Sequence, residues 1–157
     1  MGKGLLQPRA TSQKIEFSVV TKEIDFRSRA FGIVEYYKEH TPYTFGEALC
    51  KCMDSGHVTV MTLSERTGIS ERQIGRLRNN EVKDIGFRTI IALCVALGLV
   101  LETAEKLLNL KRYTLQCDDP YVQICKMFLQ INISVSVCND LLQSLGFEPL
   151  TDGEIWS

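Results

Sequence analysis

Side chains that can bind a nucleic acid gather between residues 70 and 79. Arg72 and Arg76 are four residues apart, so a helix would place both on one face. A guanidinium can donate paired hydrogen bonds to guanine O6 and N7 or to a phosphate, although such a pair can also be a solvated helix surface. Glu71 can accept a hydrogen bond from cytosine N4, or it can simply favour the start of a helix. The candidate DNA-binding residues are Ser70, Glu71, Arg72, Gln73, Gly75, Arg76 and Asn79.

Three of these side chains can also serve the helix itself. Ser70 is a good N-cap, and Gln73 three residues later would complete a capping box, which competes with a contact to adenine. Asn79 can contact a phosphate or close the helix, because asparagine tolerates the left-handed conformation. Both interpretations stay open for Gln73 and Asn79.

Two short helices, at about 60–67 and 71–79, are expected to position these side chains. Gly68 lies between them, where a sharp turn needs a positive φ that a Cβ would penalise. Ile69 follows and can fill the angle between the helices. This arrangement is typical of a helix-turn-helix, whose second helix can enter the major groove of DNA.

Residues 44 to 110 resemble the helix-turn-helix domain of the phage-repressor (Cro and xenobiotic-response-element) family. The family has a run of leucine, a small residue, polar residues and glycine, and residues 63–68 are similar to it. The family's next run is a hydrophobic residue, serine, three polar residues and isoleucine, and residues 69–74 are similar to it. The resemblance implies five helices, with the second and third forming the motif, and double-stranded DNA as the partner. Val60 departs from the family's usual glutamine at the start of the second helix, so the phosphate contact of that glutamine is either lost or supplied by another residue. Arg78 replaces a frequent glutamate and adds positive charge.

The expected fold class is all-α, and the chain is expected to have three parts. Residues 1–40 would be an N-terminal extension with a possible short strand at 14–20 and a helix at about 26–39. Residues 41–112 would be the helix-turn-helix bundle, opened by a capping box at Thr44 and Glu47. Residues 113–157 would be a C-terminal helical hairpin, with helices at about 120–130 and 134–145.

The charge distribution is compatible with DNA, although the net charge is −1. The net charge is +2 in residues 1–40, +2 in residues 41–112 and −5 in residues 113–157. The acidic C-terminal part therefore hides the basic character of the rest. No apolar run reaches the length of a membrane span or of a signal peptide, so the protein is expected to be cytoplasmic.

The cysteines and the polar residues do not suggest a metal centre or an active site. The six cysteines have no C-x-x-C spacing, so we expect reduced thiols, no metal and no cofactor. No phosphate-binding loop or nucleophile motif is present, so an enzyme is not expected. The sequence does not identify a small-molecule effector.

The pattern predicts a sequence-specific transcriptional regulator that binds double-stranded DNA through residues 71–79. A non-catalytic, antitoxin-like adaptor is the alternative, because the small net charge and Val60 both allow it. A homodimer is expected, since repressors of this kind pair two half-sites. The broad apolar faces of the C-terminal helices could form that dimer, or they could fold back onto the bundle of the same chain.

Overall fold

A computed structural model describes residues 26–36 and 44–152. The chain divides into two compact units, Met1–Pro42 and Tyr43–Ser157. In the first unit, residues 26–36 are helical, within the helix expected at about 26–39. The strand expected at 14–20 lies outside the described residues.

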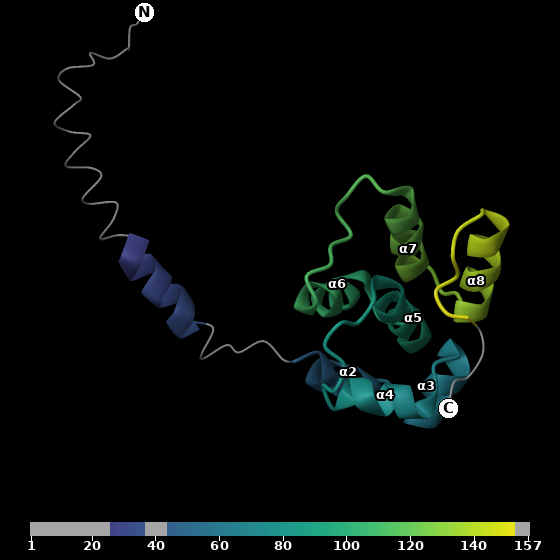
Figure 1. The fold of residues 1–157 in the computed structure, drawn as a ribbon, viewed down its shortest axis with the longest axis horizontal. Helices are drawn as coiled ribbons and strands as arrows, with labels where there is room; N and C mark the ends of the chain where they lie inside the picture. Colours follow the sequence, from purple (N-terminus) through teal and green to yellow (C-terminus); the bar gives the residue numbers. More distant parts are fainter. Residues whose placement is uncertain (1–25, 37–43, 153–157) are drawn as a thin grey trace, which may run out of the picture. The chain divides into compact units, whose positions relative to one another are not determined.

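Helices make up all the regular secondary structure of the described residues, which confirms the predicted all-α class. The second unit contains these helices in chain order (Figure 1): α2 (Phe45–Ser55), α3 (Val60–Thr67), α4 (Glu71–Arg78), α5 (Phe87–Leu97), α6 (Leu101–Leu110), α7 (Pro120–Gln130) and α8 (Val135–Ser144). The helices expected at about 60–67, 71–79, 120–130 and 134–145 correspond to α3, α4, α7 and α8, and each of these four begins after a side-chain cap. Side-chain caps are provided by Thr44, Thr59, Ser70, Asp119 and Ser134.

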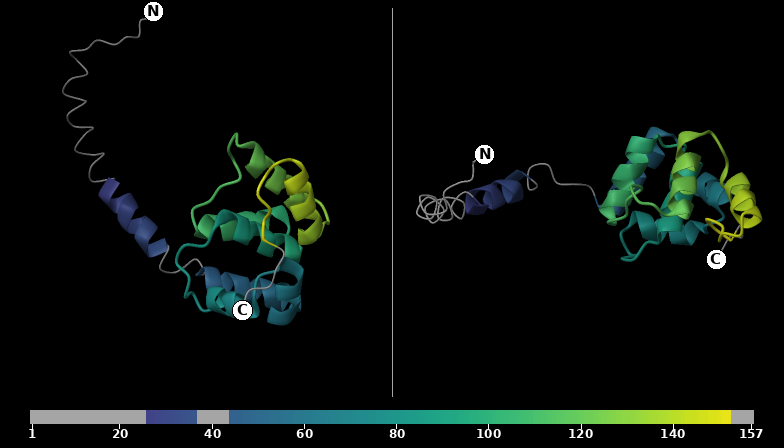
Figure 2. Two further views of the ribbon diagram at one scale, coloured as in Figure 1. Left: turned by 45° about the vertical axis from the view of Figure 1, so that its right-hand side comes forward. Right: turned by 90° about the horizontal axis from the view of Figure 1, so that it is seen from above.

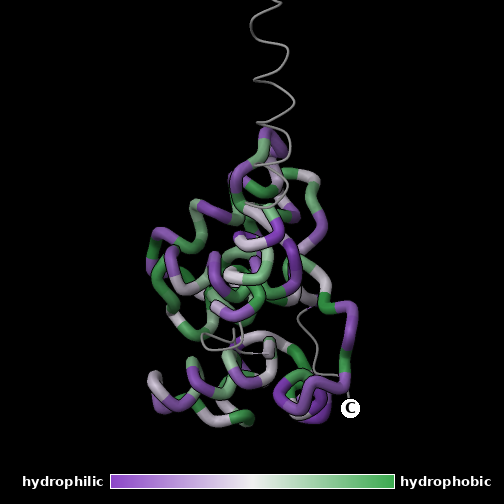
Figure 3. The backbone as a smooth tube through the Cα atoms, turned by 90° about the vertical axis from the view of Figure 1, so that its left-hand side faces the viewer, coloured by the Kyte–Doolittle hydropathy of each residue, from purple (hydrophilic) through white to green (hydrophobic). Residues whose placement is uncertain are grey.

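Helix α5 is the centre of the hydrophobic core. Every residue from Ile90 to Ala96 is buried, and α5 contacts α3, α6, α7 and α8. The surrounding helices are amphipathic, so hydrophobic and hydrophilic stretches alternate along the tube in Figure 3. One continuous core therefore joins the bundle to the two C-terminal helices.

The C-terminal helices follow each other as expected, but their main contacts are with the bundle. Helix α7 packs against α5 and α6, and α8 packs against α3 and α5. Their inward faces are buried there, including Phe128 and Leu142. The apolar faces were expected either to form a dimer or to pack onto the bundle of the same chain, and the structure shows packing onto the same chain. The three-part division at residues 1–40, 41–112 and 113–157 stays a prediction.

The chain turns back after α8 toward the end of the bundle formed by α3 and α4 (Figures 1 and 2). We name residues Phe147–Asp152 the C-terminal strap. In the part of the chain that the structure describes, no helix is long and apolar enough to cross a membrane. The cytoplasmic location stays a prediction.

Candidate nucleic-acid interface

The turn between α3 and α4 has the geometry that the sequence predicts. Gly68 has φ 82°, in the left-handed region, and its N–H donates to the Ser64 carbonyl to close α3. The Thr67 hydroxyl donates to the Leu63 carbonyl (2.8 Å) and accepts from the Ile69 N–H (3.0 Å). Ile69 is buried in the angle between the helices. These local bonds determine the direction in which α4 leaves the turn.

The N-terminus of α4 is capped by Ser70 alone. The Ser70 hydroxyl accepts a hydrogen bond from the Gln73 N–H at 3.1 Å. The reciprocal bond of a capping box, from the Gln73 side chain to the Ser70 N–H, is absent among the described residues, so the capping box predicted here is wrong. The Gln73 side chain is therefore not used in the cap, whereas the Ser70 hydroxyl is.

Helix α4 is held against α2 by a close contact that the sequence did not predict. Gly46 lies so near α4 that a Cβ on it would collide with the Arg78 carbonyl and lie 2.8 Å from Asn80 Oδ1. Asn80 has φ 59° and accepts from the Gly46 N–H at 2.8 Å. Its amide also donates to Thr44 Oγ1 at 3.0 Å. The start of α2 and the end of α4 are thus joined by hydrogen bonds.

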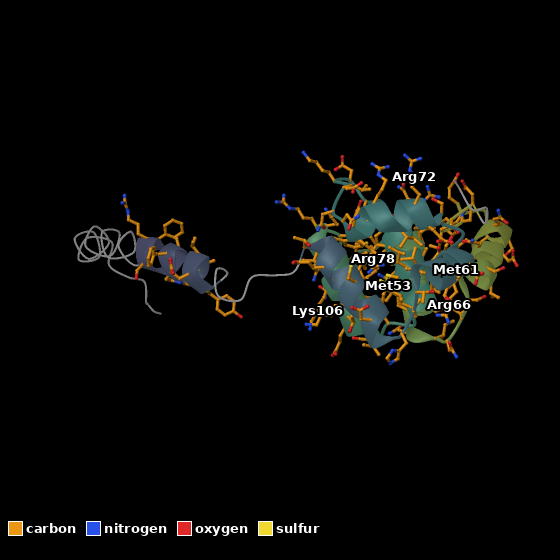
Figure 4. All side chains as sticks on the ribbon, turned by 90° about the horizontal axis from the view of Figure 1, so that it is seen from below. Met53, Met61, Arg66, Arg72, Arg78 and Lys106 are labelled. Atoms are coloured by element: carbon orange, nitrogen blue, oxygen red, sulfur yellow. The ribbon has the colours of Figure 1, made fainter. Side chains whose placement is uncertain are left out.

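The exposed face of α4 carries the predicted arginines. Arg72 projects away from the bundle (Figure 4). Arg76 is also exposed. Arg76 Nε lies 3.8 Å from Glu81 Oε1, in an ion pair whose side chains are about half exposed. Arg78 points elsewhere, because its Nε donates to Cys50 Sγ of α2 at 3.2 Å. The positive charge of the exposed face therefore comes from Arg72 and Arg76.

An open groove of about 680 Å³ runs beside this face. Four of the predicted site residues line it: Ser70, Arg72, Gln73 and Arg76. Glu71, Gly75 and Asn79 lie outside its lining, although Glu71 and Asn79 are exposed on α4 or at its end. The remaining lining residues are Gly68, Ile69, Gly86, Phe87, Arg88, Thr89, Leu150, Thr151 and Asp152.

The first turn of α5 is a part of the groove that sequence reasoning missed. Helix α5 begins after Gly86 with no side-chain cap, so its first N–H groups have no capping partner among the described residues. Arg88 in that turn adds a third arginine to the groove. An arginine and a threonine just after a glycine at a helix start are a weak signal for an anion-binding turn. Only the packing of α5 against α3 makes that turn part of the same groove.

The C-terminal strap forms the other wall, and aromatic contacts anchor it. The rings of Tyr121 and Phe147 have centroids 5.5 Å apart. The ring of Phe87 is tilted against Tyr121 at 6.5 Å and meets Tyr113 edge to face at 5.6 Å. The Tyr113 hydroxyl donates to the Ile85 carbonyl at 2.8 Å, just before α5. This cluster links the start of α5 to α7 and to the strap.

The cysteines are free thiols, and Cys94, Cys125 and Cys138 are buried. Burial raises the pKa of Cys125 to about 12 and that of Cys138 to about 11, so both thiols stay protonated at neutral pH. Burial also raises the pKa of Cys94. Within residues 26–36 and 44–152, no three metal-binding side chains are grouped around a common point. The absence of a metal or cofactor stays a prediction.

Comparison with known proteins identifies the part of the chain that carries this groove. No curated protein and no solved structure matches the chain. One family model does match, and it covers residues 48–115, which include most of α2 and all of α3, α4, α5 and α6. That model describes the Cro/C1-type helix-turn-helix DNA-binding domain, so residues 48–115 are similar to the DNA-binding domains of the phage-repressor type.

Proposed function

We propose that the protein is a sequence-specific, double-stranded-DNA-binding transcriptional regulator whose helix α4 enters the major groove. The observation that carries this proposal is the exposed Arg72 and Arg76 face on a helix held at both ends. Ser70 caps the start of α4 and Asn80 ties its end to α2. A helix held in this way needs no ordering of its backbone at the moment of binding, so only the arginine side chains lose freedom.

Bases and phosphates would be contacted by different parts of the groove. Arg72 and Arg76 can read guanine edges, and Gln73 has a free amide for adenine. The uncapped first turn of α5 can donate its N–H groups to a phosphate, and Arg88 supplies charge there. Asn79 at the end of α4 is a further phosphate candidate. Ser70 and Gly75 would allow close approach of the DNA rather than donate to it.

A homodimer is part of this proposal. One helix-turn-helix contacts few base pairs, and a dimer would place two copies of α4 on half-sites about one DNA turn apart. The inward faces of α7 and α8 are buried within the chain. The remaining exposed apolar side chains of the C-terminal region are Met127, Ile131, Val137 and Leu145. These residues are the candidates for a contact between two copies.

The test is DNA binding by arginine variants of the whole chain. We expect Arg72→Ala and Arg76→Ala each to weaken binding to the selected operator by about 1–3 kcal/mol, the usual value of a bidentate base contact. Lys106→Ala removes the same charge from α6, on a part of the molecule away from α4 (Figure 4). This control should bind like the parent protein.

The operator is first selected from random duplexes, and affinity is then measured by fluorescence anisotropy at several salt concentrations. Folding of each variant is checked by its melting temperature. If Arg72→Ala and Arg76→Ala fold and still bind the operator as tightly as Lys106→Ala does, α4 is not the recognition helix. A protein that shows no salt-dependent affinity for any duplex would instead fit the antitoxin-like adaptor, since phosphate contacts always carry salt dependence.

A further inference from the structure

The C-terminal strap is fixed to the DNA-binding domain by contacts that DNA recognition does not need. Asn139 Oδ1 accepts from the Leu150 N–H (2.8 Å) and the Thr151 N–H (3.4 Å). Its amide donates to Thr151 Oγ1 at 3.2 Å. The Thr151 hydroxyl donates in turn to the Thr67 carbonyl, at 2.6 Å, beside the turn of the helix-turn-helix. Leu150 is 3% exposed. The strap is therefore a built part of the fold.

The strap also binds the arginine at the start of α5. Arg88 Nη1 donates to the Pro149 carbonyl at 2.9 Å and lies 3.4 Å from Glu148 Oε1. The Glu148 side chain is 82% exposed, so this carboxylate is held at the surface rather than in the core. The Tyr121 hydroxyl donates to the Glu148 carbonyl at 3.3 Å and helps to keep the segment in place. A carboxylate thus occupies the side of Arg88 where a phosphate could bind.

A second carboxylate of the strap lies in the groove itself. Asp152 lines the groove together with Arg72, Gln73 and Arg76. Asp152 makes no hydrogen bond and no ion pair among the residues that the structure describes. Its negative charge therefore lies beside the same groove as the side chains of Arg72 and Arg76. A phosphate in that groove would be repelled, because charges interact over ~10 Å at ordinary salt.

We propose that the C-terminal strap regulates the DNA site by competing with DNA phosphates. Glu148 occupies Arg88, and Asp152 repels phosphates from the groove between α4 and α5. The strap lowers the affinity for DNA, and its displacement or neutralisation raises it. This inference rests on the proposed DNA-binding function, and it concerns the strength of binding rather than the bases that are read.

Neutralising Asp152 without changing its shape is the first test. Asp152→Asn breaks no described hydrogen bond, so its effect is mainly electrostatic. We expect this variant of the whole chain to bind a random-sequence duplex about three to ten times more tightly at low salt, because one nearby like charge is removed. Asp54→Asn is the matched control, because it makes the same charge change on α2 outside the groove. Its affinity should stay within about twofold of the parent value.

The competition for Arg88 is tested by a double-mutant cycle. Glu148→Gln should tighten binding to the same duplex, and the gain should be clearly smaller when Arg88 is already alanine, because only the general charge repulsion is then removed. Melting temperatures show whether the variants remain folded. If the parent binds DNA and neither Asp152→Asn nor Glu148→Gln binds more tightly, the regulatory role of the strap is refuted while the DNA-binding function stands. If only the neutralised variants bind DNA, the result supports inhibition by the strap. If no variant binds DNA, both the DNA-binding function and the regulatory role of the strap are refuted.

Discussion

At the scale of single residues, the arginines of α4 have different partners although they lie close together in the sequence. Arg72 is exposed, Arg76 is paired with Glu81, and Arg78 donates to Cys50. The periodicity of a helix explains this difference, since Arg78 lies about 200° from Arg76 around the axis. Helical spacing correctly grouped Arg72 with Arg76, but it did not show that Arg78 faces α2.

Gly68 is the residue whose conformation matters most for the direction of α4. Its φ of 82° is favourable for glycine and costly for a β-branched residue. We expect Gly68→Val to lower the free energy of unfolding by more than about 1 kcal/mol. Gly68→Asn should cost less, because asparagine tolerates this region better.

Thermal or urea unfolding of the two variants would measure this difference. If the valine and asparagine variants are equally stable, residue 68 does not need the positive φ, and the prediction is wrong. The parent protein and the Arg72→Ala variant supply the reference for an exposed change on the neighbouring helix.

At the scale of elements, the packing of α2 against α4 decides where α4 lies. Gly46 on α2 has no room for a Cβ, because the Arg78 carbonyl and Asn80 Oδ1 occupy that space. The Arg78 carbonyl is backbone and cannot move aside as a flexible side chain would. A change at Gly46 must therefore displace the end of α4.

Gly46→Ala is expected to lower the free energy of unfolding by about 1–3 kcal/mol, the usual cost of overpacking. Gly75→Ala is the control on α4, since nothing lies within 4 Å of its Cβ position. That change should raise the free energy of unfolding by about 0.5–1 kcal/mol, because glycine is a poor residue within a helix. Denaturant unfolding measures both values, and a neutral Gly46→Ala would mean that α2 and α4 can separate without cost.

At the scale of the whole molecule, the C-terminal helices complete the core of the DNA-binding unit. Phe128 on α7 is 1% exposed and belongs to the same buried cluster as α5. We expect Phe128→Ala to lower the free energy of unfolding of the whole unit by about 3–5 kcal/mol. Met127→Ala, next in sequence and 41% exposed, should cost much less.

Calorimetry distinguishes a single transition from separate ones. If Phe128→Ala shows a separate transition at lower temperature while the main transition keeps its melting temperature, α7 folds independently of the bundle. One transition shifted as a whole is the result expected from a continuous core.

Dimer formation also belongs to this scale. We expect light scattering to show a dimer of the whole chain at tens of micromolar, because half-site recognition needs two copies. Charged replacements of two exposed residues, Val137→Glu with Leu145→Glu, should shift the protein toward the monomer. A parent protein that is monomeric at that concentration would exclude a stable dimer, and an unaffected variant would place the contact elsewhere.

Local signals in the sequence were enough to predict most of the helices and the turn. The caps at Thr44 and Ser70, the glycine at 68 and the apolar spacing around Ile74 act within a few residues of one another. The resemblance of residues 44–110 then identified the family, and the match over residues 48–115 confirms it. The candidate arginines followed from the same short stretch, because helical spacing alone places Arg72 beside Arg76.

The tertiary structure alone decided what surrounds those arginines. The Thr151–Thr67 bond joins residues 84 positions apart, and the bonds from Arg88 to the strap span 60 and 61 positions. No local pattern encodes such pairs, because they depend on α8 and α7 packing on the bundle rather than on each other. The sequence by itself therefore determined helix α4 and its pair of exposed arginines, whereas the folded core determined the groove, its third arginine and its acidic wall.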